Sequence, residues 1–175
     1  MKLDDLKIMP YIEIDGIRLL RNSEVLSCFE RMAQDGTAES VFYDQGIQTP
    51  QEFLSFIKTD VDLFLYFEYL GQPAGIAWFQ QIASGVAQGH FCLFSSMWGQ
   101  PEIVEIGKQV VQYAFKVYHL IIGFIPRWNV RAINYMEELG ADRVAVLPSF
   151  AKSGELAPDE VVMISFTRGY NENLH

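Results

Sequence analysis

The stretch that decides the fold is GFIPRWNVRAINYMEELGADRVAVL, residues 123–147. Asn129 is a typical helix N-cap and Gly140 is typical of the position just after a helix, so a helix is predicted between them. The apolar run HLIIGFIP, residues 119–126, predicts a strand buried on both faces. A further strand is predicted after the helix, and the stretch therefore indicates strand, helix and strand in succession.

The residues before this stretch predict a three-stranded antiparallel meander over residues 62–96, with turns near Gly71–Gln72 and Ser84–Gly85. A helix is predicted next, with Pro101 in its first turn. Because that helix joins strand 86–95 to strand 119–126, we expect the two strands to be parallel neighbours in a right-handed crossover. The inner stripe of the helix is expected to consist of Ile103, Ile106, Val110, Ala114 and Val117.

Capping and turn residues mark the other elements. Ser23 predicts the start of a helix that ends near Gly36, and Thr49 with Glu52 predicts a capping box on a second helix. Strands are predicted at 16–21, 142–150 and 159–168. The order predicts a single α+β domain over residues 16–170, with a mixed, mostly antiparallel sheet of six or seven strands and helices on both faces. Residues 1–15 are expected to form an N-terminal extension.

The composition excludes several classes of function. The formal net charge is −9, which argues against nonspecific binding to nucleic acid or to an anionic membrane, because both need a basic surface. Cys28, Cys92 and three scattered histidines show no metal-ligand spacing, so no metal is expected. The cysteine usage and an N-terminus without an apolar signal segment predict that the protein is cytoplasmic.

A few residues could carry chemistry. Tyr135 falls at the edge of the predicted helix stripe, where its hydroxyl could reach a crevice, although an amphipathic boundary tyrosine explains the position as well. His90 shares a strand face with Gln88 and Cys92, and it could act as a base or be a hydrogen-bonded sheet histidine. Glu68 lies in mid-strand among aromatic residues, where a solvent-facing role is the alternative.

The element order and the stretch 123–147 resemble the GNAT superfamily of acyl-CoA N-acyltransferases, and the GFIPRWN motif is similar to a divergent phage and prophage branch of it. The resemblance covers residues 16–168. It implies that Asn129 contacts the CoA arm and that Tyr135 protonates the leaving thiolate as general acid. It also implies that backbone groups of Cys92 and Phe94 bind the acetyl and pantetheine groups where the two parallel strands separate.

The resemblance leaves the base and the phosphate loop open. Transfer of an acetyl group to an amine needs a base, and His90 and Glu68 are the alternatives, since Gln88 stands where some family members carry a glutamate. Trp98, Pro101 and Ile103 stand at the positions of the usual glycine-rich phosphate loop, where Gly99 is the one small residue, and proline has no N–H to donate. Positive charge for the phosphates could come from three residues close in the sequence: Lys108, Arg127 and Arg131.

Two functions from different classes follow. The first is an N-acetyltransferase that uses acetyl-CoA as co-substrate, without a metal, and acts on a primary amine of a small molecule, peptide or protein. The second is a GNAT-like module that binds a partner without catalysis, as a phage-related accessory protein. Acceptor specificity is expected in the early helices and in the loops at 36–49 and 148–158, and the chain is expected to be a monomer or homodimer.

Overall fold

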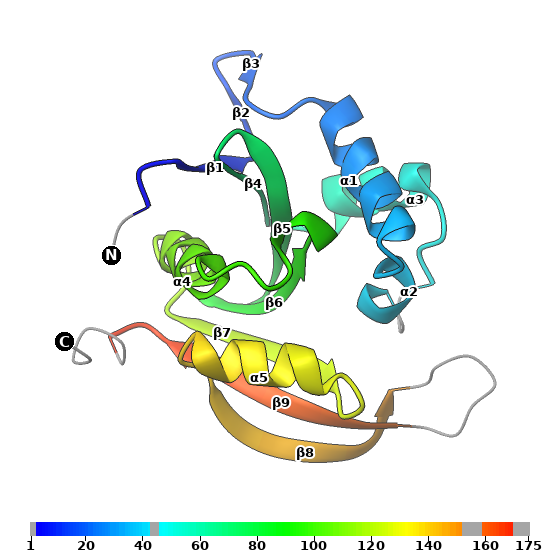
Figure 1. Ribbon diagram of the computed structural model, residues 1–175, viewed down its shortest axis with the longest axis vertical. Helices are drawn as coiled ribbons and strands as arrows, with labels where there is room; N and C mark the ends of the chain where they lie inside the picture. Colours follow the sequence, from blue (N-terminus) through cyan, green and yellow to red (C-terminus); the bar gives the residue numbers. More distant parts are fainter. Residues whose placement is uncertain (1–2, 43–45, 152–158, 170–175) are drawn as a thin grey trace.

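The computed structural model describes residues 3–42, 46–151 and 159–169. These residues form a seven-stranded mixed sheet with the order β1-β4-β5-β6-β7-β9-β8, and a separate two-stranded hairpin, β2-β3. The hairpin projects from the end of the molecule near α1 (Figure 1). The strands are β1 (Leu6–Pro10), β2 (Glu13–Ile14), β3 (Ile17–Arg18), β4 (Leu63–Tyr69), β5 (Gln72–Ala83), β6 (Val86–Leu93), β7 (Leu120–Pro126), β8 (Asp142–Ala151) and β9 (Asp159–Thr167).

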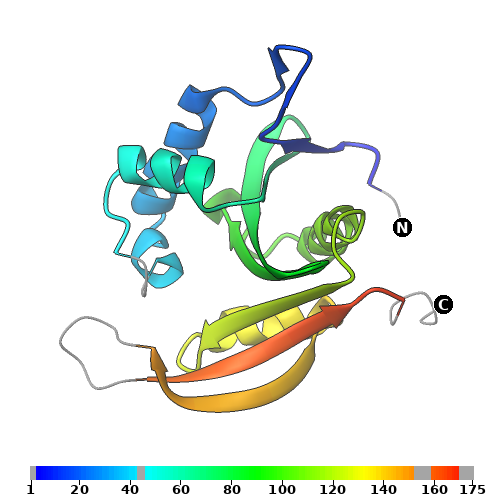
Figure 2. The same ribbon diagram turned by 180° about the vertical axis from the view of Figure 1, so that it is seen from behind.

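Helices cover both faces of the sheet, as Figures 1 and 2 show. One face packs against α1 (Asn22–Gln34), α2 (Ala38–Val41) and α3 (Pro50–Thr59), and the other against α4 (Ile103–Ala114) and α5 (Val130–Glu138). Alternate residues of a strand point to opposite faces, so each face has its own apolar core. Trp78 of β5 lies in the core under α1–α3, and Phe79 lies in the core under α4 and α5. The predicted α+β fold class is confirmed.

The one parallel pairing in the seven-stranded sheet is short. β6 and β7 pair only where Val86, Ala87 and Gln88 lie opposite Leu120, Ile121 and Ile122. Beyond Gln88, β6 stays paired with β5 as far as Leu93, and β7 stays paired with β9 as far as Pro126. The two halves of the sheet therefore separate after Gln88 and Ile122, and we call the space between the unpaired parts of β6 and β7 the gap.

The sequence located most element ends, because local capping groups mark them. Thr49 Oγ1 accepts a hydrogen bond from the Glu52 N–H, and Glu52 reaches back to the Thr49 N–H, so the predicted capping box is confirmed. Both predicted meander turns are confirmed as well. Asn129 caps α5 through its Oδ1, which accepts a hydrogen bond from the Ala132 N–H at 3.2 Å.

Several details differ from the sequence predictions. Pro101, expected in the first turn of a helix, precedes α4, which begins at Ile103. Residues 6–10, expected in an extension, form the edge strand β1 and pair with β4. The strand expected at 16–21 shrinks to Ile17–Arg18 of the hairpin. The N-cap of α1 is Arg21 rather than Ser23. Val117 lies beyond the end of α4 and is 57% exposed, because the helix stops at Ala114.

β7 was predicted to be buried on both faces, but its residues alternate. Ile121, Gly123 and Ile125 are buried under α4 and α5, whereas Ile122 and Phe124 are only partly buried. The gap removes one neighbouring strand from this part of β7, so its second face is incompletely covered. Across the described residues, none of the helices is long and apolar enough to cross a membrane.

Candidate active site

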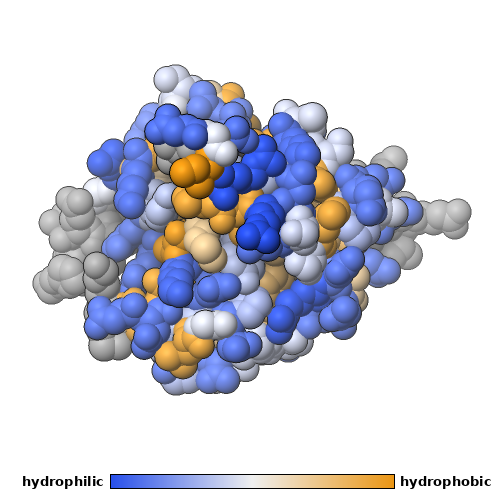
Figure 3. Space-filling model, turned by 90° about the horizontal axis from the view of Figure 1, so that it is seen from above, coloured by the Kyte–Doolittle hydropathy of each residue, from blue (hydrophilic) through white to orange (hydrophobic). Residues whose placement is uncertain are grey.

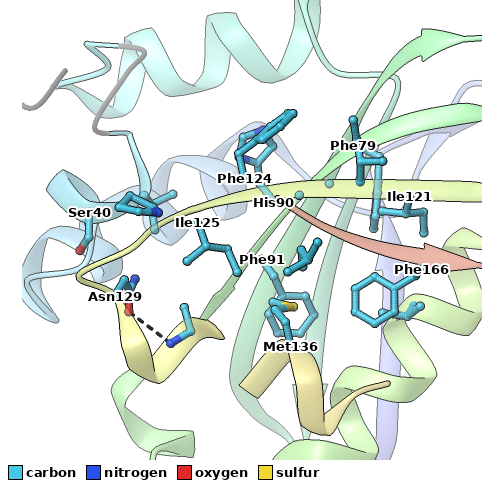
Figure 4. A pocket seen from close by; sticks show the side chains of 18 residues that line it. Ser40, Phe79, His90, Phe91, Ile121, Phe124, Ile125, Asn129, Met136 and Phe166 are labelled. Carbon is cyan, nitrogen blue, oxygen red and sulfur yellow. Dashed lines mark hydrogen bonds between the residues drawn. The ribbon is translucent and has the colours of Figure 1, made fainter. Parts of the chain in front are cut away.

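The gap between β6 and β7 contains a cavity of about 120 Å³. The three residues that follow the last paired position of β6 line it, and so does β7 from Ile121 to Pro126. Figure 4 shows His90, Phe124 and Ser40 on one side of β7 and Phe91, Met136 and Phe166 on the other. The full lining is Ser40, Val41, Phe79, Gly89, His90, Phe91, Val111, Ile121, Ile122, Gly123, Phe124, Ile125, Pro126, Asn129, Ala132, Met136, Ile164 and Phe166.

Backbone direction decides which β6 groups face the gap. The Phe94 N–H donates to the Ala74 carbonyl of β5 at 3.0 Å. Backbone groups of an antiparallel strand point alternately to its two neighbours, so Cys92 also points to β5, while Phe91 and Leu93 point toward β7. In keeping with this backbone direction, the Leu93 carbonyl accepts a hydrogen bond from Trp98 Nε1 at 3.3 Å. The prediction that Cys92 and Phe94 offer their backbone groups in the gap is therefore not supported, and Phe91 and Leu93 take those positions.

Tyr135 does not line the cavity. Its hydroxyl donates to the Ile103 carbonyl at the start of α4, at 2.9 Å, and its ring packs on Phe91 with centroids 5.8 Å apart. Burial and the nearby Glu138 raise the pKa of Tyr135 above its usual value, so the phenol is protonated at neutral pH. The next residue of the helix, Met136, faces the cavity instead. A shift of one residue turns the side chain by about 100°.

His90 is held between an aromatic ring and an amide. Its ring stacks on Trp78 with centroids 5.0 Å apart and planes 6° from parallel, and its Nε2 lies 3.2 Å from Gln88 Nε2. Because the amide nitrogen of Gln88 can only donate, His90 Nε2 accepts and the ring proton lies on Nδ1. Burial lowers the pKa of His90 to about 4. The imidazole is therefore neutral at pH 7, and its acceptor nitrogen is engaged with Gln88.

The other acid–base residue predicted, Glu68, lies elsewhere. It accepts a hydrogen bond from the Tyr66 hydroxyl at 3.1 Å and pairs across the sheet with Lys7 of β1 and Pro73 of β5. Two strands separate it from β7, and it does not line the cavity. Of the two bases considered from the sequence, the structure brings only His90 to the gap. Within the described ranges, no group of three or more acidic, histidine or cysteine side chains is placed to hold a metal.

The β6–α4 junction does not form an open cradle for phosphate. The N–H groups of Trp98, Gln100 and Ile103 already donate to carbonyls of the junction itself, and Pro101 has no N–H. Gly99 adopts a φ of +77°, and a Cβ there would meet nothing within 4 Å, so the backbone is exposed at this point. The residues present therefore fit the acyl-bearing arm of CoA in the gap, but not its diphosphate on a glycine-rich loop.

Two predicted binding residues meet beside the β6–α4 junction. The Arg131 guanidinium lies 5.6 Å from the centre of the Trp98 ring, which is 43% exposed. This cation–π pair connects the β6–α4 junction to α5, beside Asn129. Arg127 is engaged in an ion pair with Glu160. Arg131 therefore supplies positive charge next to the junction, where three of the backbone N–H groups are occupied.

Comparison with solved structures identifies the fold. Spermidine N-acetyltransferase from Vibrio cholerae, solved with CoA and spermine, matches with a TM-score of 0.73 and 12% identity over 93% of this chain and 95% of that chain. AAC(6')-Ib, solved with ribostamycin and coenzyme A, matches with a TM-score of 0.72 and 16% identity over 96% of this chain and 97% of that chain. No family model and no curated protein sequence matches this chain. The chain therefore has the fold of the GNAT acyltransferases.

A third solved structure has the same fold. A GNAT-family acetyltransferase from Bacillus anthracis matches with a TM-score of 0.71 and 14% identity, over 95% of this chain and 96% of that chain. The coverage is nearly complete in both directions, so the likeness extends over the whole sheet rather than one motif. At these identities it defines the fold, and the activity has to be argued from the gap itself.

Proposed function

We propose that this chain is an N-acyltransferase that moves an acyl group from an acyl-CoA thioester to a primary amine. The observation that carries the proposal is the gap, where two parallel neighbours stop pairing after three residues and enclose a cavity between them. A sheet that served only as a scaffold would gain by continuing the pairing, because unpaired backbone groups are costly when buried. The GNAT fold and the CoA bound to the neighbours named above support the same assignment.

The residues of the gap fit the chemistry of acyl transfer. The Phe91 N–H points to the gap, where it can donate to the thioester carbonyl oxygen and stabilise the negative charge that develops there. His90 lies on the opposite side of β7, where an incoming amine that displaces the Gln88 amide could be oriented by the neutral imidazole and pass its proton to it (Figure 4). The amine nitrogen forms the new bond to carbon as the carbon–sulfur bond breaks, and the sulfur takes up a proton.

Arg131 and Trp98 are proposed to replace the glycine-rich loop. A guanidinium binds phosphate oxygens with two parallel hydrogen bonds, and its stacking on an indole ring holds it in place. Asn129 lies beside them at the start of α5 and lines the cavity. The diphosphate of CoA would then be held by side chains rather than by backbone N–H groups. The acidic first turns of α4, with Glu102 and Glu105, favour such a shift of the phosphates toward α5.

Calorimetric and thermal-shift titration with acetyl-CoA and CoA test the proposal. A ligand at one hundred times its dissociation constant stabilises the folded protein by about 2.7 kcal/mol. Ala132→Leu should occupy part of the cavity and weaken binding by about tenfold, which corresponds to about 1.4 kcal/mol. Asn134→Leu is the matched control, because Asn134 is exposed on the same helix. The absence of any shift at millimolar acetyl-CoA would refute the proposal.

The second function, a non-catalytic binding module, is favoured by the β2–β3 hairpin. This hairpin and its flanks expose Ile12, Ile17 and Leu19, with Ile17 67% exposed. The face seen from above in Figure 3, toward which the hairpin projects, is mostly hydrophilic with small hydrophobic groups. A role as a phage-related accessory protein belongs to this alternative. It predicts that Ile17→Asp abolishes capture of a partner while CoA causes no shift in melting temperature.

A further inference from the structure

The inner end of the cavity is entirely apolar. Phe79, Val111, Ile121, Ile164 and Phe166 form it, and each of these side chains is at most 8% exposed. They belong to the core between the sheet and helix α4, so the cavity reaches inward from the gap into that core. None of the residues that line the cavity in the described part of the chain carries a charge.

Two glycines stand where the strands separate. Gly89 of β6 and Gly123 of β7 both line the cavity and directly follow the last parallel pair. A Cβ at Gly123 would lie 3.1 Å from Ile164 and 3.7 Å from the Gly89 carbonyl oxygen. A side chain at this position would therefore narrow the passage between the gap and the inner end of the cavity.

The cavity has a polar part and an apolar part. Its volume of about 120 Å³ covers both the part beside Ser40 and Asn129 and the inner end beside Phe166, and a water molecule in the liquid takes about 30 Å³. With the thioester in the polar part, the methyl group of an acetyl would leave the apolar inner end unfilled. Because empty apolar space forfeits packing contacts, a longer hydrocarbon group would bind more tightly.

We propose that the acyl group transferred by this protein is longer than acetyl, with a chain of about four to six carbons that occupies the inner end of the cavity. The inference rests on the proposed acyltransferase function. The transfer breaks the acyl carbon–sulfur bond, forms the carbon–nitrogen bond, moves a proton from the amine to a base and returns one to the sulfur. The chain itself takes no part in the chemistry, and its burial contributes only binding and position.

The acyl chain fits this space better than the amine does. The polar side chains of the lining, Ser40, His90 and Asn129, lie away from Phe166 at the inner end (Figure 4). An ammonium group placed at the inner end would be buried without a partner, which is strongly unfavourable. A polyamine is excluded there for the same reason.

Binding of a chain-length series tests the inference. Dissociation constants for CoA, acetyl-CoA, butyryl-CoA, hexanoyl-CoA and decanoyl-CoA should be measured by calorimetry. We expect about fourfold tighter binding for each added methylene up to about six carbons, followed by a loss at decanoyl-CoA. Equal or weaker binding of hexanoyl-CoA relative to acetyl-CoA overturns the inference while leaving the proposed function intact. Failure of every CoA compound to bind overturns both.

Variants at the inner end sharpen the test. Val111→Phe should reduce the ratio of hexanoyl-CoA to acetyl-CoA affinity by at least tenfold, because the larger ring fills the space. Gly123→Ala provides a milder block if the first variant does not fold. Gln112→Phe, exposed on the same helix, should keep the wild-type ratio. An unchanged ratio of hexanoyl-CoA to acetyl-CoA affinity in a folded Val111→Phe or Gly123→Ala protein overturns the inference. The inference is also overturned if hexylamine, rather than the long acyl chain, binds more strongly in this space.

Discussion

Acid should destabilise this protein through His90. The pKa of His90 is about 4 in the folded chain because the ring is desolvated, against 6.5 for an ordinary histidine. Between these two values the unfolded chain binds a proton that the folded chain does not, so stability falls as the pH decreases from 6.5 toward 4. Each unit of pKa difference corresponds to about 1.4 kcal/mol. The loss attributable to His90 is therefore up to about 3 kcal/mol, and about 2 kcal/mol of it should be present by pH 5.

The assay is urea unfolding of the wild type and of His90→Phe at pH 7, 6 and 5. Phenylalanine keeps the stack on Trp78 but cannot be protonated, so the variant should lose about 2 kcal/mol less than the wild type between pH 7 and 5. His119→Gln removes an exposed imidazole instead of a desolvated one and serves as the matched control. Parallel pH profiles for the wild type and His90→Phe would refute the reasoning.

Three further predictions concern caps, the helix contact and the thiols. Thr49→Ala should lower the free energy of unfolding by about 1 kcal/mol, whereas Ser23→Ala should leave it almost unchanged, since of these two residues Thr49 alone caps a helix with its side chain; equal effects in urea unfolding would contradict this. Tyr135→Phe should cost about 1 kcal/mol through the lost hydrogen bond to α4 and leave turnover intact, whereas a drop in turnover would restore the phenol as general acid. Burial raises the pKa of Cys28 and of Cys92 to about 12, so a thiol reagent at pH 8 should label neither in the native protein and both in urea.

The local signals in the sequence were reliable where a structure depends on neighbours along the chain. The capping box at Thr49 and the N-cap at Asn129 need only residues within three positions, and the structure forms both. The meander turns follow from Gly71 and Gly85, which adopt φ angles of +72° and +69°. The predicted N-cap at Ser23 is wrong, because Arg21, two residues earlier, is the N-cap of α1 and forms a capping box with Glu24.

The sequence by itself determined the order of the elements from β4 to β9, the capping of α3 and α5 and the parallel relation of β6 to β7, because short-range spacing encodes these features. Only the tertiary structure decided which groups face the gap. Backbone direction alternates with every residue of a strand, and a helix turns by about 100° per residue, so an error of one position exchanges Phe91 for Cys92 or Met136 for Tyr135. Long-range strand pairing and helix packing decide which of two adjacent residues faces the gap. They also create the apolar cavity, which no local sequence pattern predicts.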